Sequence, residues 1–291
     1  GNVLLKLGKN KEAIKCFNSA IDINPVNAKA WWFKGIALDN SGKYKSAIKC
    51  FDKAIEIKPD YVEAWHSKGV CLYRLGKYEE AISCYDRVLE IEPGDVETLN
   101  NKGIALSKLG KYEEAIKCFD RAIEIKPEFA SVWNNKGTAY DNLGRYEEAI
   151  KCFDRAIEIN PDDALVWINK GGTLFRLGRY EEAISCYGRA LEIEPGSAMA
   201  WHNMGSALFQ LGRYEEAVSC YDRVIEIEPE NLDAWYNRGA ALVILRRFDE
   251  AIDSFLNFIR FAPPGLEKVV EEVREVVKEL ESLTHPLAPS L

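Results

Sequence analysis

The chain has 291 residues, 47% of them hydrophobic and 29% charged, with a formal net charge of −8. No apolar run approaches the roughly 18 residues that a membrane-spanning helix needs, and the first residues lack the charged, apolar and small segments of a signal peptide. Because an acidic chain has no general attraction for nucleic acid phosphates or an anionic membrane surface, neither is expected as a partner.

A fixed spacing of 34 residues organises the chain. Glycine, alanine and tryptophan recur with this spacing, as do eight prolines: Pro25, Pro59, Pro93, Pro127, Pro161, Pro195, Pro229 and Pro263. A period of this size is typical of a solenoid, in which one supersecondary unit is repeated and stacked. No single unit buries its apolar face alone, so stability is expected to depend on several neighbouring repeats.

Each unit carries two helical patterns, called helix A and helix B. In one unit, Trp133, Gly137 and Tyr140 have the i, i+4, i+7 spacing of helix A. Gly144 is expected to end this helix, because glycine tolerates the positive φ of a C-terminal cap. Helix B follows and ends before Pro161, which lacks a backbone N–H. A glycine inside helix A costs about 1 kcal/mol relative to alanine, so we expect it to allow close approach of the two helices.

The apolar positions predict the core and the charged positions the solvated surface. We expect the tryptophan series and one aromatic residue from each helix B to be core; the latter are Phe51, Tyr85, Phe119, Phe153, Tyr187, Tyr221 and Phe255. Charged residues on helix B are expected to pair at i, i+4 spacing and to serve solvation rather than recognition.

The repeat resembles the tetratricopeptide repeat signature at Trp133, Gly137, Tyr140, Ala149, Phe153, Ala156 and Pro161. The resemblance implies an all-α, right-handed superhelical solenoid of 34-residue helix-turn-helix repeats, with the A helices lining a concave face. It covers residues 1–265. These divide into a partial repeat 1–27 and full repeats 28–61, 62–95, 96–129, 130–163, 164–197, 198–231 and 232–265.

The two ends of the array differ. The partial repeat 1–27 lacks half of its helix A and the chain has no initiator Met, which predicts a fragment or an engineered boundary. We expect this end to be open and apolar. At the other end, residues 266–284 form an amphipathic pattern that predicts a capping helix over the last repeat, with a coiled-coil contact as the alternative. The tail, residues 285–291, is expected to be disordered.

The cysteines do not predict a metal site or a disulfide framework. Seven of the eight recur every 34 residues, one to a repeat, so they are not grouped as the ligands of one ion would be. They are interpreted as small, half-buried apolar residues. Thiols that avoid pairing fit a reducing cytoplasm.

The predicted concave face is the candidate binding site. In this fold, positions 2, 5, 6, 9, 12 and 13 of helix A point toward it. Position 6 is asparagine in five successive repeats, namely Asn101, Asn135, Asn169, Asn203 and Asn237. Because an amide both donates and accepts, such a ladder could pair with a peptide backbone. It resembles the asparagine ladder in the repeat domain of O-linked N-acetylglucosamine transferase. The alternative is that these amides are simply solvated.

Side chains beside the ladder are candidate binding anchors. Hydrogen bonds of about 0.5–1.5 kcal/mol each fall short of the roughly 8 kcal/mol of micromolar affinity, so side-chain pockets must contribute. The candidates are Tyr73, Phe175, Phe209 and Tyr236, with Leu165, Ile168 and Met199 beside them, and the cations Arg74 and Arg176. The competing interpretation is that the chain's own tail or a second copy covers this wall. The cation and asparagine positions of a chaperone-type carboxylate clamp are absent.

No catalytic motif accompanies these features. The sequence has no GxxxxGK[ST], GxSxG or HExxH, and its three histidines lie far apart. We therefore expect a non-enzymatic scaffold that binds an extended segment of another protein, without a cofactor. Two alternatives are a structural module that self-associates through its N-terminal end or C-terminal helix, and a targeting domain cut from a larger enzyme.

Overall fold

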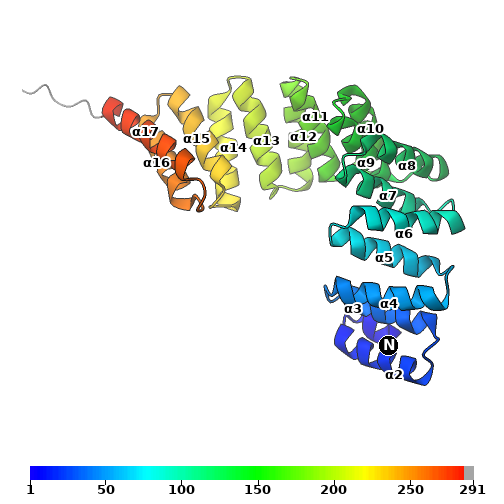
Figure 1. Ribbon diagram of the computed structural model, residues 1–291. Coiled ribbons are helices and arrows are strands. Elements are labelled where there is room, and N and C mark those ends of the chain that lie inside the picture. Colours follow the sequence, from blue (N-terminus) through cyan, green and yellow to red (C-terminus); the bar gives the residue numbers. More distant parts are fainter. Residues whose placement is uncertain (285–291) are drawn as a thin grey trace, which may run out of the picture. The chain divides into compact units, whose positions relative to one another are not determined.

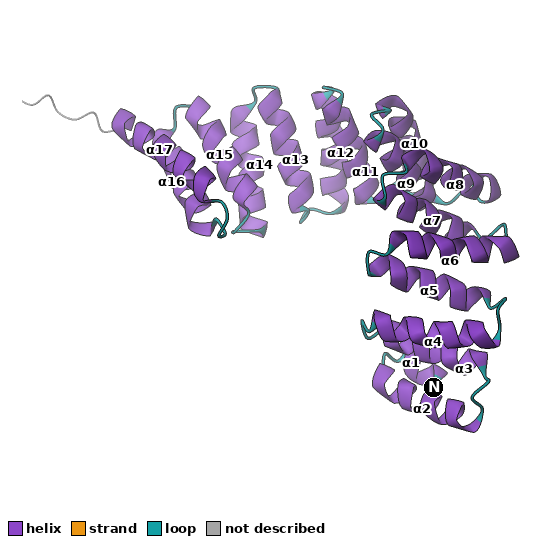
Figure 2. Cartoon of the chain, in the orientation of Figure 1, coloured by secondary structure: helices purple, strands orange, loops and turns teal. Residues whose placement is uncertain are grey.

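The computed structural model describes residues 1–284, in which every regular element is a helix (Figures 1 and 2). The predicted tail, 285–291, lies outside the described residues. The helices are α1 (Asn2–Lys6), α2 (Asn10–Ile23), α3 (Ala28–Asp39), α4 (Tyr44–Ile57), α5 (Val62–Arg74), α6 (Tyr78–Ile91), α7 (Val96–Lys108), α8 (Tyr112–Ile125), α9 (Ala130–Asn142), α10 (Tyr146–Ile159), α11 (Ala164–Arg176), α12 (Tyr180–Ile193), α13 (Ala198–Gln210), α14 (Tyr214–Ile227), α15 (Leu232–Ile244), α16 (Phe248–Phe261) and α17 (Glu267–Thr284).

The helices pair as the repeat pattern predicts. The chain divides into two compact units, Gly1–Glu148 and Ala149–Leu291. Within each unit, an A helix packs against the B helix that follows it, and that B helix packs against the next A helix. Neighbouring A helices also touch, as in α5 with α7 and α13 with α15. Side chains of successive A helices therefore meet, which confirms the predicted all-α solenoid of paired helices.

The glycine in the middle of helix A makes room for an aromatic ring of helix B. A Cβ on Gly103 would stand 2.4 Å from Phe119 Cε1, and one on Gly171 would stand 2.6 Å from Tyr187 Cε1. The seven helix B aromatic residues predicted as core are all between 0 and 4% exposed. The close approach expected from the sequence is confirmed, and the ring is its physical cause.

The tryptophan series is only half-buried, so the prediction that it is core was partly wrong. Each indole packs its ring against the repeat while its Nε1 donates to the carbonyl of the proline six residues earlier. Trp133 Nε1, for example, lies 2.9 Å from Pro127 O. An indole carries a polar N–H that needs a partner when it is removed from water. The solvent-edge position supplies that partner, whereas Leu99, which has no such group, is 2% exposed.

Helix A ends in a left-handed residue in every repeat. Gly144 and Gly178, the predicted caps, have φ of 73° and 76°. In the last repeat, the same position is Arg246, with φ of 58°, the single non-glycine residue of positive φ in the described range.

Ion pairs link successive repeats, and the sequence did not predict them. A cation at position 7 of helix A contacts an aspartate of the preceding helix B in Lys68–Asp52, Lys102–Asp86, Lys136–Asp120, Lys170–Asp154 and Arg238–Asp222, at 2.5–2.7 Å. Within single helices, the charged pairs have i, i+3 spacing almost throughout, as in Arg155–Glu158, and not the predicted i, i+4.

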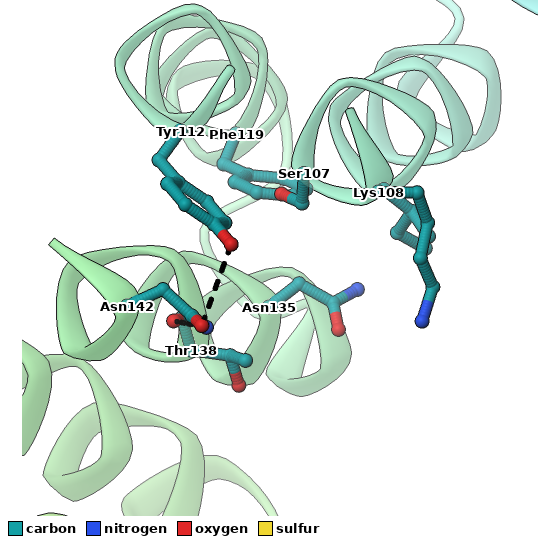
Figure 3. A pocket seen from close by; sticks show the side chains of 8 residues that line it. Ser107, Lys108, Tyr112, Phe119, Asn135, Thr138 and Asn142 are labelled. Atoms are coloured by element: carbon teal, nitrogen blue, oxygen red, sulfur yellow. Dashed lines mark hydrogen bonds between the residues drawn. The ribbon is translucent and has the colours of Figure 1, made fainter. Parts of the chain in front are cut away.

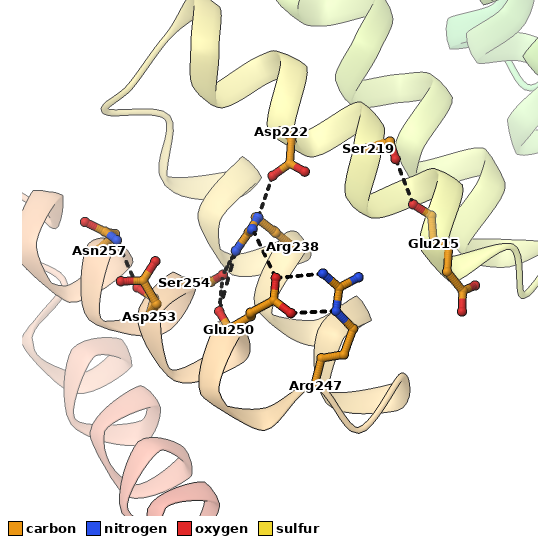
Figure 4. A network of polar contacts seen from close by, with 9 residues as sticks. All are labelled: Glu215, Ser219, Asp222, Arg238, Arg247, Glu250, Asp253, Ser254 and Asn257. Carbon is orange, nitrogen blue, oxygen red and sulfur yellow. Dashed lines mark hydrogen bonds and ion pairs between the residues drawn. The ribbon is translucent and has the colours of Figure 1, made fainter.

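The last repeat departs from the others in a concerted way (Figure 4). Ser254 is 0% exposed at the position that is cysteine in earlier repeats. Arg238 satisfies it, since its Nη1 donates to Ser254 Oγ at 2.6 Å while its Nε donates to Asp222 Oδ1 at 2.6 Å. Helix α17 then packs against α16, with Val273, Val277 and Leu280 buried.

Candidate functional site

Successive A helices are joined by polar contacts between position 5 of one repeat and position 6 of the next. Three such contacts lie in the first unit: Trp32 Nε1 to Ser67 Oγ at 3.1 Å, Asn101 Nδ2 to His66 Nε2 at 3.2 Å, and Asn135 Nδ2 to Asn100 Oδ1 at 2.9 Å. Asn101 and Asn135 are therefore half-buried and each uses one amide donor to hold the preceding repeat. Their carboxamide oxygens have no hydrogen-bond partner among the described residues.

The asparagines of the second unit are placed differently. Asn203 and Asn237 form no side-chain hydrogen bond with another described residue. Ile168, at position 5 of the repeat before Asn203, is apolar and 6% exposed, so it offers no partner. Before Asn237, the His202 ring packs edge-on against Tyr221, with centroids 5.8 Å apart. Asn169 occupies the same helix position on α11.

Exposed apolar side chains lie on the A helices of the second unit, two of them on the helices that carry these amides. Leu165 is 51% exposed, Met199 57% and Tyr236 44%. Ile168, which the sequence placed beside them, is buried instead because its side chain joins the core around Tyr187. The residues at position 9 are small in each repeat of this unit: Gly172, Ser206 and Ala240. We call this surface the second-unit A face and define it by Leu165, Met199, Asn203, Tyr236 and Asn237.

The predicted aromatic anchors at position 12 contact their own repeats. The ring centroids of Tyr73 and Tyr78 are 5.4 Å apart, and the Phe175–Tyr180 and Phe209–Tyr214 centroids are each 5.2 Å apart. Tyr73, Phe175 and Phe209 are all half-buried. Each ring therefore stabilises the turn between helices A and B and leaves only part of its surface for a ligand.

The predicted cations of the face both have partners within the protein. Arg74 Nη1 contacts Asp39 Oδ1 of the preceding repeat at 2.6 Å, and its guanidinium lies 5.6 Å from the centre of the Tyr44 ring. Arg176 runs beside Gly172, where a Cβ would stand 3.7 Å from its Nη1. Arg74 is thus already neutralised by the protein.

Two hollows occur at equivalent places between repeats. The larger, of about 380 Å³, lies in the first unit and is lined by Ile104, Ser107, Lys108, Tyr112, Phe119, Asn135, Thr138 and Asn142 (Figure 3). The smaller, of about 160 Å³, lies in the second unit and includes Phe209, Tyr221 and Asn237. Ser107 and Phe209 share position 12, and the larger phenylalanine side chain occupies space that is open beside the serine.

Family profiles agree with this repeat architecture. Profiles described as tetratricopeptide repeat match residues 1–61, 60–128, 130–163, 152–185 and 232–264, and one described as TPR repeat matches 171–212 and 205–243. The chain belongs to the tetratricopeptide repeat (TPR) family. A search of curated protein sequences gave no match.

Solved TPR structures share the fold. MamA is 26% identical, with a TM-score of 0.52 over 56% of this chain and 95% of its own. YrrB, described as a TPR protein with an unusual peptide-binding site, is 24% identical, with a TM-score of 0.54 over 64% of this chain and 96% of its own. The APC/C hetero-tetramer Cut9–Hcn1 is 20% identical, with a TM-score of 0.64 over 82% of this chain and 47% of that one.

The cysteines and the potential metal ligands of residues 1–284 are free thiols and dispersed side chains. Among residues 1–284, no three His, Cys, Asp or Glu side chains are grouped to hold a metal ion, and no helix is long and apolar enough to cross a membrane. The eight cysteines, all within that range, form no disulfide. Burial raises the pKa of the Cys84 and Cys186 thiols to about 11 and that of Cys220 to about 12.

Sequence reasoning missed Asn100 and His66 as partners of the ladder. Their position, the fifth of helix A in each repeat, is visible in the sequence. What the sequence does not give is the offset between stacked helices, which brings position 5 of one repeat to position 6 of the next. Tyr112 and Asn142 were missed for the same reason, whereas Lys108 is one of the cations that the sequence places on this face.

Proposed function

We propose that this TPR chain is a non-enzymatic scaffold that binds an extended segment of a partner protein along its A helices. The observation that carries the proposal is the state of Asn203 and Asn237, whose amides have no partner among the described residues while exposed apolar side chains lie on the same helices. Each amide offers two N–H donors and an accepting oxygen, which suits both groups of a peptide backbone.

The energetics place most of the affinity in apolar contacts. Neutral hydrogen bonds contribute about 0.5–1.5 kcal/mol each, so two asparagines supply only a small part of the roughly 8 kcal/mol of micromolar binding. Covering a Leu or Met side chain contributes about 1.5–3 kcal/mol when it is fully buried. The ligand is therefore expected to carry apolar side chains that cover Leu165 and Met199, with the amides fixing its direction and register.

Family resemblance supports the same activity. YrrB shares the fold and is described as having an unusual peptide-binding site, and Cut9–Hcn1 is described as a hetero-tetramer. These relatives give no partner or sequence motif for this chain. We also assign the protein to the cytoplasm, because eight thiols without a disulfide suit a reducing compartment.

Peptide selection followed by affinity measurement tests the proposal. Random 12-residue peptides are selected on the wild-type protein, and the Kd of the best binders is measured by fluorescence anisotropy. The variant Asn203→Ala/Asn237→Ala is expected to bind about tenfold more weakly, since two hydrogen bonds are lost. Asn160→Ala/Asn257→Ala removes two asparagines outside the A helices and is the matched control. Unchanged affinity in the first variant, or selection of no peptide, contradicts the proposal.

A second candidate function, self-association, is favoured by the outer side of α17. Val269 and Val276 are each 38% exposed and Leu283 is 62% exposed, and they stand seven residues apart along the helix. Val3 and Leu7, near the other end, are 71% and 65% exposed. Light scattering at increasing protein concentration distinguishes the two functions, because self-association requires the measured mass to grow. Val276→Glu should then restore the monomer mass.

A further inference from the structure

The hollow of the first unit is built from three helices and has an apolar floor. Ile104 comes from α7, Phe119 from α8 and Asn135 from α9. Phe119 is 0% exposed, so its ring is fixed by the core while its edge reaches the hollow. A volume of about 380 Å³ is within the range of small-molecule sites and accommodates one amino-acid side chain.

Lys108 stands at the rim of this hollow and has no ion-pair partner among the described residues. The preceding repeat shows what such a partner would be, because Arg74, at the same helix position, pairs with Asp39 of the repeat before it. The residue that corresponds to Asp39 for Lys108 is Tyr73, which has no negative charge. The protein thus places a cation here without the carboxylate that accompanies it one repeat earlier.

Other donors face the same hollow and are held in place. Asn142 Nδ2 donates to the Thr138 carbonyl at 2.7 Å, and its Oδ1 accepts from Tyr112 Oη at 3.4 Å. An O–H···O bond is normally 2.5–3.0 Å long, so the Tyr112 hydroxyl is readily redirected to a better acceptor. Figure 3 shows the Lys108 and Asn135 side chains extending from two different helices, and both residues line the hollow.

We propose that this hollow, the Lys108 pocket, binds a glutamate side chain of the peptide ligand. The carboxylate accepts hydrogen bonds from Lys108 Nζ and the Tyr112 hydroxyl, and its two methylene groups lie on Ile104 and Phe119. A charge-assisted bond is about twice as strong as a neutral one, so the pocket selects an acid over its amide. The inference rests on the proposed function for the nature of its ligand.

The pocket differs from its equivalent in the second unit. In the equivalent place of the second unit, Phe209 replaces Ser107 and Gln210 replaces Lys108, which reduces the volume to about 160 Å³ and removes the cation. The hollow of the second unit therefore has neither the volume nor the positive charge to bind an acidic side chain. The second unit therefore shows the effect of a phenylalanine at position 12. Ser107→Phe is expected to narrow the Lys108 pocket in the same way.

The test follows the Ile104 methyl group by NMR in full-length protein labelled at isoleucine methyls. Three probes are titrated: N-acetyl-glutamate N-methylamide, its glutamine analogue, and N-acetyl-leucine, which carries only an α-carboxylate. We expect a saturable shift of Ile104 with the glutamate probe. Binding of both other probes should be at least about tenfold weaker, because one lacks the charge and the other places it too close to the backbone.

Variants test whether the glutamate probe binds in the Lys108 pocket. Lys108→Gln and Ser107→Phe are each expected to weaken the glutamate probe about tenfold or more. Lys117→Gln is the matched control, since Lys117 is an exposed residue of α8 that has no ion pair among the described residues and its loss changes the net charge equally. No Ile104 shift with the glutamate probe, equal binding of the glutamine analogue, or retained binding in Lys108→Gln overturns the inference. Tighter binding of N-acetyl-leucine would likewise overturn it in favour of a peptide C-terminus.

Failure of this inference can be distinguished from failure of the proposed function. The selection experiment tests peptide binding at the second-unit A face by substituting Asn203 and Asn237, whereas the Ile104 methyl group reports binding in the first unit alone. Loss of peptide binding with an intact glutamate response would remove the scaffold function and keep the pocket. The reverse result would keep the scaffold and remove the pocket.

Discussion

Lys170 Nζ lies 2.6 Å from Asp154 Oδ1 and so ties helix α11 to the B helix of the repeat before it. At the next junction both partners differ, since Met204 stands in place of the lysine and Gly188 in place of the aspartate. A charge left alone in a half-buried junction would lose its hydration without gaining a partner. The joint replacement avoids this penalty, and Met204 packs instead against the apolar core around Tyr187.

Gly188 lowers the stability of helix α12, because glycine is unfavourable inside a helix. It lies inside α12, and a Cβ built there meets nothing within 4 Å. Gly188→Ala is therefore expected to raise the free energy of unfolding by about 0.5–1 kcal/mol, because alanine loses less backbone entropy in a helix. The urea midpoint of unfolding, followed by circular dichroism, measures this gain.

Gly171→Ala is the control for that substitution, because the same chemical change meets a filled space. The added Cβ would stand 2.6 Å from Tyr187 Cε1, so the ring or the helix must shift. Overpacking of this kind costs about 1–3 kcal/mol. Equal shifts of the two midpoints would show that propensity alone, and not the ring, governs the central glycine of helix A.

The array of paired helices could be predicted from the sequence because each repeat encodes it locally. Gly144 has the predicted positive φ, and Phe119 and Tyr187 lie in the core as expected. Periodicity gives the face of a side chain but not its depth, so Trp133 was placed in the core although its indole N–H keeps it at the edge. Contacts between repeats, such as Asn135 with Asn100, depend on how far stacked helices are offset, which no single repeat contains.

Arg246 is a strained helix end that glycine should relieve. Its φ is 58°, in the left-handed region where the equivalent residues Gly178 and Gly212 have φ of 76°. An L-residue with a Cβ pays about 1–2 kcal/mol for this conformation. Arg246→Gly is expected to stabilise the protein by about 1 kcal/mol, less than the full strain because glycine gains entropy in the unfolded chain.

The reciprocal substitution, Gly212→Arg, tests the same cause in the opposite direction. It should lower the free energy of unfolding by about 1 kcal/mol, as measured by thermal or urea unfolding. Because the cap lies at a surface turn, neither change should alter the helix content. A loss of stability in Arg246→Gly would mean that the arginine side chain contributes more than its backbone costs.

The cysteines are expected to react in an order set by burial. Burial raises the pKa of the Cys84 and Cys186 thiols to about 11 and that of Cys220 to about 12, whereas Cys16 is exposed. Since the thiolate is the nucleophile, buried thiols at pH 8 are both inaccessible and almost wholly protonated. Iodoacetamide should therefore modify Cys16 first, with the other three protected until the protein unfolds. Peptide mass spectrometry against time measures each rate, and rapid modification of Cys220 in the folded protein would contradict this packing.

His202 makes the stability of the second unit depend on pH. Burial lowers its pKa below the usual value, and the nearby Asp233 carboxylate opposes this only in part. In the unfolded chain the pKa of this histidine is about 6.5, so the unfolded chain binds a proton more readily than the folded protein does. The free energy of unfolding should be greatest above that value, fall as the pH drops toward the folded pKa, and change no further below it.

His202→Gln tests this dependence, because glutamine is polar but does not titrate. As the pH is lowered from about 7.5 to about 5.5, the wild type should lose stability relative to the variant. Urea unfolding at both pH values measures the difference in free energy of unfolding between the two proteins, in which the effects of their shared carboxylates cancel. A difference that stays constant across the range would show that His202 takes up protons as readily in the folded protein as in the unfolded chain. Packing of its ring against Tyr221 would then have no effect on its protonation.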